Sequence, residues 1–477
     1  MFNKQVSLTK KSFLLFLYIL LLGLFGPLVY WLNSEGGNFT LKKITEKNNI
    51  KERISSGDKI LVTADNSIEK QAGVTAFAER NYNEALAKFD SALKHDRNDP
   101  EALIYRNNAQ AIAVNNNIYG NNNIYKIAVS VPIGGNLGVA KEILRGVAQA
   151  QDEINQGGGI NGNLLFVEIA NDDNNPELAK KIANEFVKQK RILAVIGHND
   201  SNASVAAAPI YQDGGLVMIT PTSSADAIPG MGNYIFRTTP SSRVLADTIA
   251  EYAIKVAGKE KIAICTDSHS ELSKSFQKEF TWAAYNHGGT VMNTKCDFSA
   301  SNFVAQDIPS RVISDGAEAL LLAPSVRQIN KAIEIAKANH DRLTLFGNHS
   351  MNTYATLKKG QVDVNGMVSV VAWYPQEGFQ NSFTENAQNL WGGAVGWRTA
   401  MAYDATKTAL VGLKVASNRQ ELQQALSNPN FVAEGATEKI SFFPSGDRKM
   451  RGTTVKVQPG KVSGTGYDFV SLDAQKP

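Results

Sequence analysis

The sequence predicts an α/β fold with two doubly wound parallel sheets, preceded by a transmembrane helix and a short α-helical hairpin. From residue 126 onward, short apolar runs alternate with amphipathic stretches, which is typical of parallel sheets built from βαβ units. A charge-free apolar run lies near the N-terminus, and a stretch with helical periodicity follows it. An asparagine-rich segment separates this helical stretch from the alternating region.

The composition is that of a folded protein. The chain has 477 residues, of which 43% are hydrophobic and 20% are charged, and its net charge is +4. Disorder is therefore not expected for most of the chain. The basic residues are scattered outside the N-terminus, so we expect no nucleic-acid partner, which would require a basic face or helix.

The N-terminus is expected to be a cytoplasmic basic tail over residues 1–11 and a transmembrane signal anchor over residues 12–32. The anchor segment has no charged residue and is long enough to cross a membrane as a helix. The basic residues that precede it are Lys4, Lys10 and Lys11. By the positive-inside rule, the bulk of the chain is then extracytoplasmic, in the periplasm. A cleaved signal peptide is the alternative, and the length of the apolar run favours the uncleaved anchor.

Residues 33–66 are expected to be a polar linker with one short strand at Lys59–Thr63. Residues 67–114 have helical periodicity and resemble one tetratricopeptide repeat. The residues that carry this resemblance are Gly73, Ala76, Tyr82, Ala85, Phe89, Ala92 and Pro100-Glu101-Ala102. Two interpretations remain open: a hairpin that binds a protein partner, or an amphipathic helical spacer. The asparagine-rich residues 115–125 are expected to be a second linker.

The alternating region predicts eight strands. Their ranges are 126–133, 163–172, 192–198, 216–221, 261–267, 290–298, 319–324 and 343–348. Helices are expected between them, and the apolar character of the strands indicates sheets that are covered on both faces. The region is too long for one sheet, so we expect two sheets of about 120 residues each.

Polar residues follow the ends of these strands, where parallel sheets bind ligands. They predict a ligand site with hydroxyl and amide donors suited to a carboxylate. The candidate ligand-binding residues are Asn199, Asp200, Ser201, Thr222, Ser223, Ser224, Glu271, Ser325 and His349. Turn chemistry and helix capping are the alternative role for the Ser and Thr residues.

Residues 125–469 resemble the type I periplasmic binding proteins, specifically the leucine/isoleucine/valine-binding group that serves ABC transporters. The matching pieces include AVIGHNDSNASVAAAPIYQDGGLVMITPTSS, YIFRTTPSS, AYDATKTAL and ISFFPSGDRK. The resemblance implies two lobes joined by a hinge that closes over the ligand. It implies a first lobe over residues 126–243 and 371–452, and a second over residues 244–370 and 453–470.

The resemblance also implies that Ser201, Thr222 and Ser224 hold the α-carboxylate of an amino acid and part of its ammonium group. The sequence departs from the family on the ammonium side, where an acidic residue is usual and His349 stands here. Glu271 is expected either to supply the missing charge or to be a surface carboxylate.

The function implied is solute capture for an ABC importer, with the ABC permease as a partner. The alternative is a membrane-anchored sensor that uses the same clamp without transport. No catalytic motif or metal-ligand spacing stands out, so we expect no enzyme activity, cofactor or metal. For Cys265 and Cys296 we favour two buried thiols, with one disulfide as the alternative.

Overall fold

The computed structural model describes residues 50–118, 124–375, 382–437 and 439–472. The chain divides into two compact units, residues 1–53 and residues 54–477. Of the first unit only residues 50–53 are described, so the basic tail, the anchor and most of the first linker lie outside the described residues. Among the residues that the structure describes, no helix combines the length and the apolar character needed to cross a membrane.

The first lobe contains a six-stranded sheet with the order β1-β3-β2-β4-β5-β6. The bounds of its strands are Ile54–Ser55 (β1), Ile124–Val131 (β2), Leu164–Asn171 (β3), Ile192–Ile196 (β4), Val217–Thr220 (β5) and Ile235–Arg237 (β6). All neighbouring strands are parallel except β1, which pairs antiparallel with β3. Buried apolar side chains on both faces of β2 and β4 explain why these strands read as continuous apolar runs.

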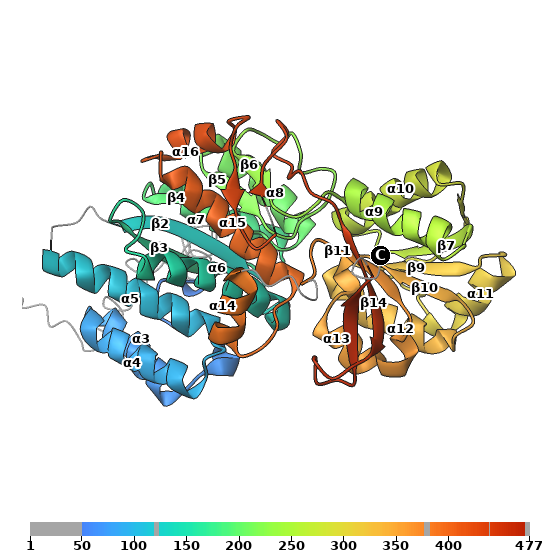
Figure 1. Ribbon diagram of the computed structural model, residues 1–477, viewed down its shortest axis with the longest axis horizontal. Helices are drawn as coiled ribbons and strands as arrows, with labels where there is room; N and C mark the ends of the chain where they lie inside the picture. Colours follow the sequence, from blue (N-terminus) through green and yellow to red (C-terminus); the bar gives the residue numbers. More distant parts are fainter. Residues whose placement is uncertain (1–49, 119–123, 376–381, 438, 473–477) are drawn as a thin grey trace, which may run out of the picture. The chain divides into compact units, whose positions relative to one another are not determined.

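Helices cover both faces of this sheet (Figure 1). α7 (Pro176–Lys188) and α8 (Ser201–Asp213) pack with one set of strand side chains, including Ala128 and Val195. α6 (Leu137–Gln156) and α15 (Trp397–Leu413) pack with the opposite set, including Val129. The remaining elements of this lobe are α14 (Ser382–Trp391), α16 (Arg419–Leu426), β12 (Ala433–Glu434) and β13 (Lys439–Ile440).

The second lobe contains a seven-stranded sheet with the order β15-β14-β11-β10-β9-β7-β8. Its strands are β7 (Lys261–Thr266), β8 (Thr290–Val291), β9 (Ala319–Ala323), β10 (Thr344–Gly347), β11 (Val368–Val371), β14 (Thr453–Pro459) and β15 (Tyr467–Ser471). The sheet is mixed, because β14 runs antiparallel to both of its neighbours. The two-lobe α/β fold is thus confirmed, whereas the expectation of purely parallel sheets is wrong at one edge of each sheet.

Helices cover the second sheet as well. α9 (Ser242–Glu251) and α10 (Glu271–Asn286) pack on one face. α11 (Ile308–Ser314), α12 (Ile329–Asn339) and α13 (Tyr354–Gly360) lie on the other. The chain crosses between the lobes after β6, after β11 and before β14. The boundaries predicted at residues 243, 370 and 452 fall in α9, in β11 and just before β14.

The strand expected over residues 290–298 is wrong, because only Thr290 and Val291 form β8. The chain continues beside β7 in the same direction, and the backbone N–H of Thr266 donates to the Cys296 carbonyl (3.0 Å). This places the Cα atoms of Cys265 and Cys296 4.6 Å apart, and the two residues form a disulfide. The expectation of two buried thiols is therefore wrong, and the alternative of one disulfide is what the structure contains.

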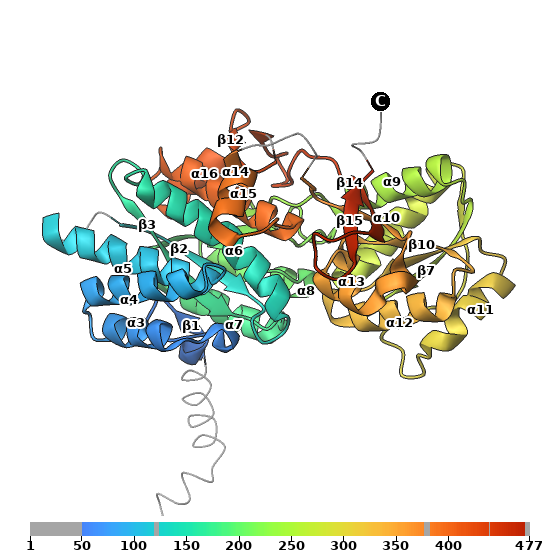
Figure 2. The same cartoon turned by 60° about the horizontal axis from the view of Figure 1, so that its bottom comes forward.

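Residues 54–118 form a layer of helices on the first lobe, which we call the helical module. It consists of β1, the short helix η1 (Thr63–Asp65), α3 (Ile68–Ala78), α4 (Tyr82–His95) and α5 (Pro100–Ile118). Figure 2 shows α3 and α4 below α5, and α5 contacts α6 and β3. Gly73 lets α3 approach α4 closely, since a Cβ atom there would lie 2.7 Å from the Phe89 ring.

The segment before α3 is fixed to the rest of the module. The strand expected at Lys59–Thr63 is wrong: the backbone N–H groups of Leu61 and Val62 donate to the Glu101 carboxylate, at 2.8 and 3.2 Å, instead of to a neighbouring strand. Lys70 is fully buried, and its Nζ lies 2.7 Å from Asp99 and 2.8 Å from Glu101. Burial lowers the pKa of Lys70, but the two carboxylates outweigh burial and raise it.

Candidate functional site

A small cavity lies between the two lobes, at the carboxyl ends of β4, β5, β9 and β10. Its volume is about 10 Å³, which is room for about one water molecule, so the lining side chains of the two lobes lie close to one another. Its lining comes from both lobes and consists of Asn199, Asp200, Ser201, Thr222, Leu272, Val326, His349, Ser350, Trp397 and Arg398.

The loop between β4 and α8 forms one wall. Asp200 caps α8, because its carboxylate accepts hydrogen bonds from the backbone N–H groups of Asn202 (2.9 Å) and Ala203 (3.4 Å). Burial raises the pKa of Asp200 to about 6, against the opposing effects of Arg327 and the cap. Thr222 donates to Asn199 through its hydroxyl, at 3.0 Å to the carbonyl and 3.1 Å to the side chain. The helix N-terminus and this hydroxyl group are suited to an anion.

Ser223 and Ser224 do not line the cavity. The Ser223 hydroxyl lies within hydrogen-bonding distance of the His198 and Asn199 carbonyls, at 3.1 and 3.2 Å. The Ser224 hydroxyl is paired with that of Ser242 at 3.1 Å. The Ser223 hydroxyl therefore holds the loop between β4 and α8 in place, whereas the Ser224 hydroxyl joins the segment after β5 to the start of α9.

The second lobe contributes the short helix η5 (His349–Met351) that follows β10. Asn348 starts this helix, since its side chain accepts a hydrogen bond from the Ser350 N–H (3.1 Å) and donates to the Pro324 carbonyl (3.1 Å). Burial and the nearby Arg398 guanidinium lower the pKa of His349 to about 3. The His349 imidazole is therefore neutral at physiological pH, and it lies edge-on to the Trp397 ring at 5.5 Å.

Glu271 and Ser325 are absent from the cavity lining. The Glu271 carboxylate binds Lys274 at 2.5 Å, and both side chains are substantially exposed. Ser325 donates a 2.5 Å hydrogen bond to Asp267, which is a buried carboxylate of the same lobe. Glu271 therefore has the role of a surface carboxylate, and Ser325 supports the loop that follows β9.

Five lining residues are not among the candidates from the sequence: Leu272, Val326, Ser350, Trp397 and Arg398. Trp397 and Arg398 begin α15 and reach the cavity from a helix. The Arg398 guanidinium donates to the Asn352 carbonyl (2.8 Å) and lies 3.6 Å from the Glu142 carboxylate. No periodic pattern in the sequence singles out this pair.

Several polar atoms of the lining have no hydrogen-bonding partner within the described structure. They are Ser201 Oγ, His349 Nδ1, Ser350 Oγ and Trp397 Nε1. Each belongs to a side chain that is at most 3% exposed. Because a buried polar group without a partner is costly, their convergence on one cavity indicates a polar ligand.

The lobes are closed over this cavity. The Asn202 side chain, from the first lobe, donates to the His269 carbonyl (2.7 Å) and accepts from the Glu271 N–H (2.8 Å) of the second lobe. Arg327 of the second lobe also donates to the Asn174 carbonyl of the first. Polar contacts between two lobes around a cavity are typical of a hinged clamp.

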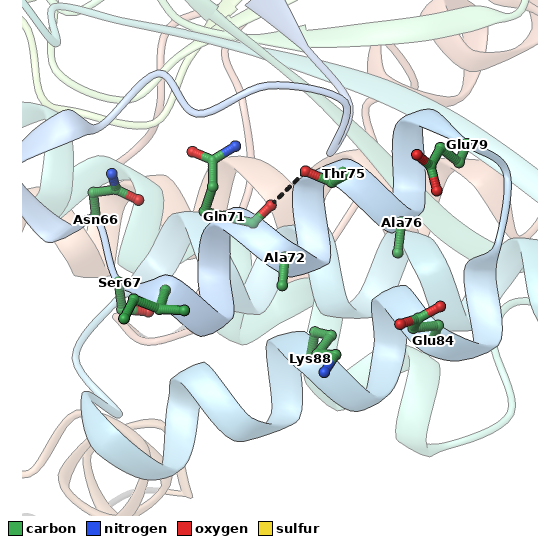
Figure 3. Close-up of a pocket in the computed structure, with 10 residues that line it drawn as sticks. Asn66, Ser67, Gln71, Ala72, Thr75, Ala76, Glu79, Glu84 and Lys88 are labelled. Carbon is green, nitrogen blue, oxygen red and sulfur yellow. Dashed lines mark hydrogen bonds between the residues drawn. The ribbon is translucent and has the colours of Figure 1, made fainter.

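A second hollow lies on the helical module, away from the lobes' cavity. Figure 3 shows it as an open groove between α3 and α4, in which Thr75 donates to the Gln71 carbonyl. Its lining is mixed polar and apolar, and consists of Asn66, Ser67, Ile68, Gln71, Ala72, Thr75, Ala76, Glu79, Glu84 and Lys88. Ile68 is exposed there at 85%.

Relatives among curated proteins share part of the chain. The Leu/Ile/Val-binding protein of Escherichia coli is 37% identical over 123 residues, which are 26% of this chain and 33% of the relative. An amino acid binding protein of Pseudomonas aeruginosa is 30% identical over 135 residues, 28% of this chain and 36% of the relative. Each match thus spans about a third of the length of the relative.

A solved structure covers more of the chain. The branched-chain amino acid transporter substrate-binding protein of Streptococcus pneumoniae, in complex with isoleucine, superimposes with a TM-score of 0.63 at 19% identity, over 73% of this chain and 99% of that chain. At this identity the likeness shows the fold. The profile of the periplasmic binding proteins matches residues 124–458, most of the chain. The chain therefore belongs to the periplasmic binding protein family.

Proposed function

We propose that the protein is an extracytoplasmic solute-binding protein that closes two lobes around a small amino acid or related carboxylate, for delivery to an ABC importer. The observation that carries the proposal is the closed cavity, whose lining residues include buried polar atoms without a hydrogen-bonding partner in the described structure. The relatives named for Leu/Ile/Val and amino acid binding support it, as does the isoleucine-bound structure from Streptococcus pneumoniae.

The cavity has the features of a binding site. Its imidazole, His349, has a pKa of about 3 and is a poor general base at neutral pH. Within the described residues no cluster of side chains is arranged to hold a metal ion. Binding by hydrogen bonds to Ser201 and to the other unpartnered atoms of the lining needs neither group.

Calorimetry on the full chain tests this proposal. The titrants are leucine, isoleucine, valine, alanine and small hydroxylated or aromatic carboxylates. We expect saturable heat and a ligand-dependent rise in melting temperature with at least one of them. No heat and no thermal shift with any of them would contradict ligand capture of this class.

The second candidate function is a membrane-anchored sensor that uses the same clamp for signalling. The observation that favours it is the helical module, which contacts the first lobe and carries the open groove between α3 and α4. In this second candidate function the groove would bind a partner protein. Cells that lack this gene separate the two functions. Loss of ligand uptake supports transport, whereas unchanged uptake with a lost ligand response supports sensing.

We further propose that residues 12–32 remain as an uncleaved membrane anchor. The length of their charge-free apolar run supports this. Intact mass of the protein purified from membranes tests it: retention of residues 1–32 is expected, and a mature chain that starts after residue 32 would contradict it.

A further inference from the structure

We propose that the second lobe has a second binding site at the outer edge of its sheet, and that this site takes a small molecule with an unsubstituted carboxamide group. The site is a pocket of about 500 Å³, which is within the range found for small-molecule sites. It shares no lining residue with the cavity between the lobes. The proposal stands on the backbone of Ile264, a residue of β7 that lines this pocket.

The pocket lies where the edge of the sheet is interrupted. Ile262 of β7 pairs with Val291, and Thr266 pairs with Asp297, so an outer segment of six residues passes four residues of β7. The two additional residues make the outer segment bulge, and its middle residues line the pocket together with Ile264. The disulfide described above holds the far end of this segment against β7.

Ile264 faces the outer segment without bonding to it. Alternate residues of a parallel strand bond to the same neighbour, and Ile264 lies midway between two residues that bond outward. The Ile262 carbonyl accepts from the Met292 N–H at 2.9 Å, and the Thr266 carbonyl accepts from the Phe298 N–H at 2.7 Å. Among the described residues, neither the N–H nor the carbonyl of Ile264 has a partner on this side. Ile264 is only 4% exposed, and buried backbone groups strongly favour a partner.

A carboxamide is the chemical complement of such a backbone pair, because its oxygen accepts and its NH₂ group donates. The first lobe contains two examples. Asn108 accepts from the Val167 N–H (2.9 Å) and donates to the Val167 carbonyl (2.7 Å). Asn155 makes the same two hydrogen bonds with Leu165, at 2.7 and 3.0 Å. A ligand carboxamide would bind Ile264 in the same way, whereas a carboxylate or a fully substituted amide lacks the donor.

The rest of the lining favours a ligand without net charge. Two basic residues, Lys295 and Arg311, and two acidic residues, Asp297 and Asp307, line the pocket, so their formal charges cancel. Phe303 adds an apolar surface on which the remainder of the ligand can pack. A neutral or zwitterionic carboxamide suits this combination.

Amide hydrogen exchange of the full chain, resolved to single residues by mass spectrometry, tests the proposal. The probes are glutamine, asparagine and benzamide, and their matched compounds without the donor are glutamate, aspartate and N,N-dimethylbenzamide. We expect at least one carboxamide to slow exchange of the Ile264 N–H by about tenfold or more, and its matched compound to leave it unchanged. The amides of β9, which has a strand on each side, are the internal control and should change less.

Two outcomes of this measurement would overturn the proposal. Equal slowing by both members of each pair, or equal slowing in β9, would show that the carboxamide is not recognised at Ile264. Exchange that no probe changes would show that water alone pairs with this residue.

A pocket-filling variant gives an independent measurement. Val304 lines the pocket and is 46% exposed, so Val304→Trp is compatible with the fold and narrows the pocket. We expect it to weaken binding of the tightest carboxamide by about tenfold or more in calorimetry. Ile313→Trp is the matched control, because Ile313 is 40% exposed and does not line the pocket. An unchanged Kd in both variants would place the ligand elsewhere and overturn the second site, while leaving the proposed function intact.

Discussion

Ser201 and Ser224 are buried hydroxyls at the carboxyl ends of neighbouring strands, but they differ in their hydrogen bonding. Ser224 is paired with Ser242 at 3.1 Å, whereas Ser201 Oγ lines the cavity without a partner. The same residue type thus serves the loop in one position and is available to a ligand in the other. A hydroxyl that is already paired inside the protein contributes to stability and not to binding.

Ser201→Ala is expected to weaken ligand binding by about 1.5–3 kcal/mol, because it removes a hydrogen bond to a charged carboxylate. Ser224→Ala is the matched control, since it removes an equally buried hydroxyl that does not line the cavity. Calorimetry with the tightest ligand should show an unchanged Kd for the control. Equal losses in both variants would contradict the assignment.

Asp200 makes stability depend on pH. Its pKa is raised from 3.8 to about 6 in the folded protein, so the folded state holds the proton more firmly than the unfolded state. The resulting stabilisation is complete below pH 3.8 and is lost as the pH rises through about 6. Asp200→Asn retains a helix-capping side chain but has no carboxyl to titrate. Its free energy of unfolding, relative to that of the wild type, should therefore increase by about 2–3 kcal/mol from pH 4 to pH 8.

Urea unfolding of the wild type and Asp200→Asn at pH 4 and pH 8 measures this difference. The free energy of unfolding of the variant, minus that of the wild type, should increase with pH. A difference that is constant or falls with pH would show that the carboxyl does not have a raised pKa.

At the scale of the secondary-structure elements, two amide side chains take the place of a neighbouring strand along part of β3. Asn108, on α5, accepts from the Val167 N–H (2.9 Å) and donates to the Val167 carbonyl (2.7 Å), as a neighbouring strand would. Asn155, on α6, does the same for Leu165, at 2.7 and 3.0 Å. β1 pairs with the following part of β3. The helical module is therefore part of the first lobe's sheet edge, and the lobe is incomplete without it.

Asn108→Ala should lower the free energy of unfolding by about 2 kcal/mol or more, because it leaves two buried backbone groups without partners. Asn184→Ala, on the exposed face of α7, is the control and should change it by less than about 0.5 kcal/mol. Urea unfolding measures both. A small effect for Asn108→Ala would indicate that water replaces the amide.

Lys70→Met should destabilise the helical module strongly. The substitution leaves Asp99 and Glu101 buried without their cation, which typically costs about 3–5 kcal/mol. Lys94→Met removes an exposed lysine from the neighbouring helix and serves as the control. Thermal unfolding followed by circular dichroism compares them, and similar melting temperatures would contradict the importance of the cluster.

The sequence predicts those elements whose side chains face a core on both sides. β4 and β9 read as strands because every residue in them is buried, and in β2 the last five of eight residues are buried. The alternating pattern does not predict β14, whose partner β11 lies about 85 residues earlier (Val368 pairs with Lys456), and residues 453–470 are assigned to the second lobe only through the family resemblance. It also misses β1, because a two-residue strand leaves no periodic pattern. Pairing partners that are distant in the chain carry no local signal.

The sequence predicts only the part of the site that follows the strands of the sheets. Ser201 and Thr222 follow strands, and the rule for parallel sheets places them at the cavity. Trp397 and Arg398 come from a helix start, where that rule does not apply. Glu271 is misplaced because Lys274, one helical turn later, satisfies its charge. That spacing is visible in the sequence and favours the surface alternative.

At the scale of the whole molecule, the two lobes meet through a few polar contacts outside the cavity. Asn202 provides two of them, to the His269 carbonyl and the Glu271 N–H. Since these contacts exist only when the lobes are closed, they bias the equilibrium toward the closed state.

Asn202→Ala should therefore weaken ligand binding by about 1–2 kcal/mol without touching the ligand. Small-angle scattering of the unliganded protein should show a larger radius of gyration than the wild type. Asn184→Ala is again the control. An unchanged Kd together with an unchanged radius would show that Asn202 does not contribute to closure.

The antiparallel pairing of β1 with β3 determines which lobe an N-terminal restraint acts on. The chain enters its large unit at Ile54, directly on the sheet edge of the first lobe. Any force applied upstream of Ile54 is thus borne by the first lobe, while the second lobe is linked only through the crossing segments. A tether attached upstream of Ile54 would therefore hold the first lobe still and leave the second lobe to move, and a fluorophore on α12 would report that movement.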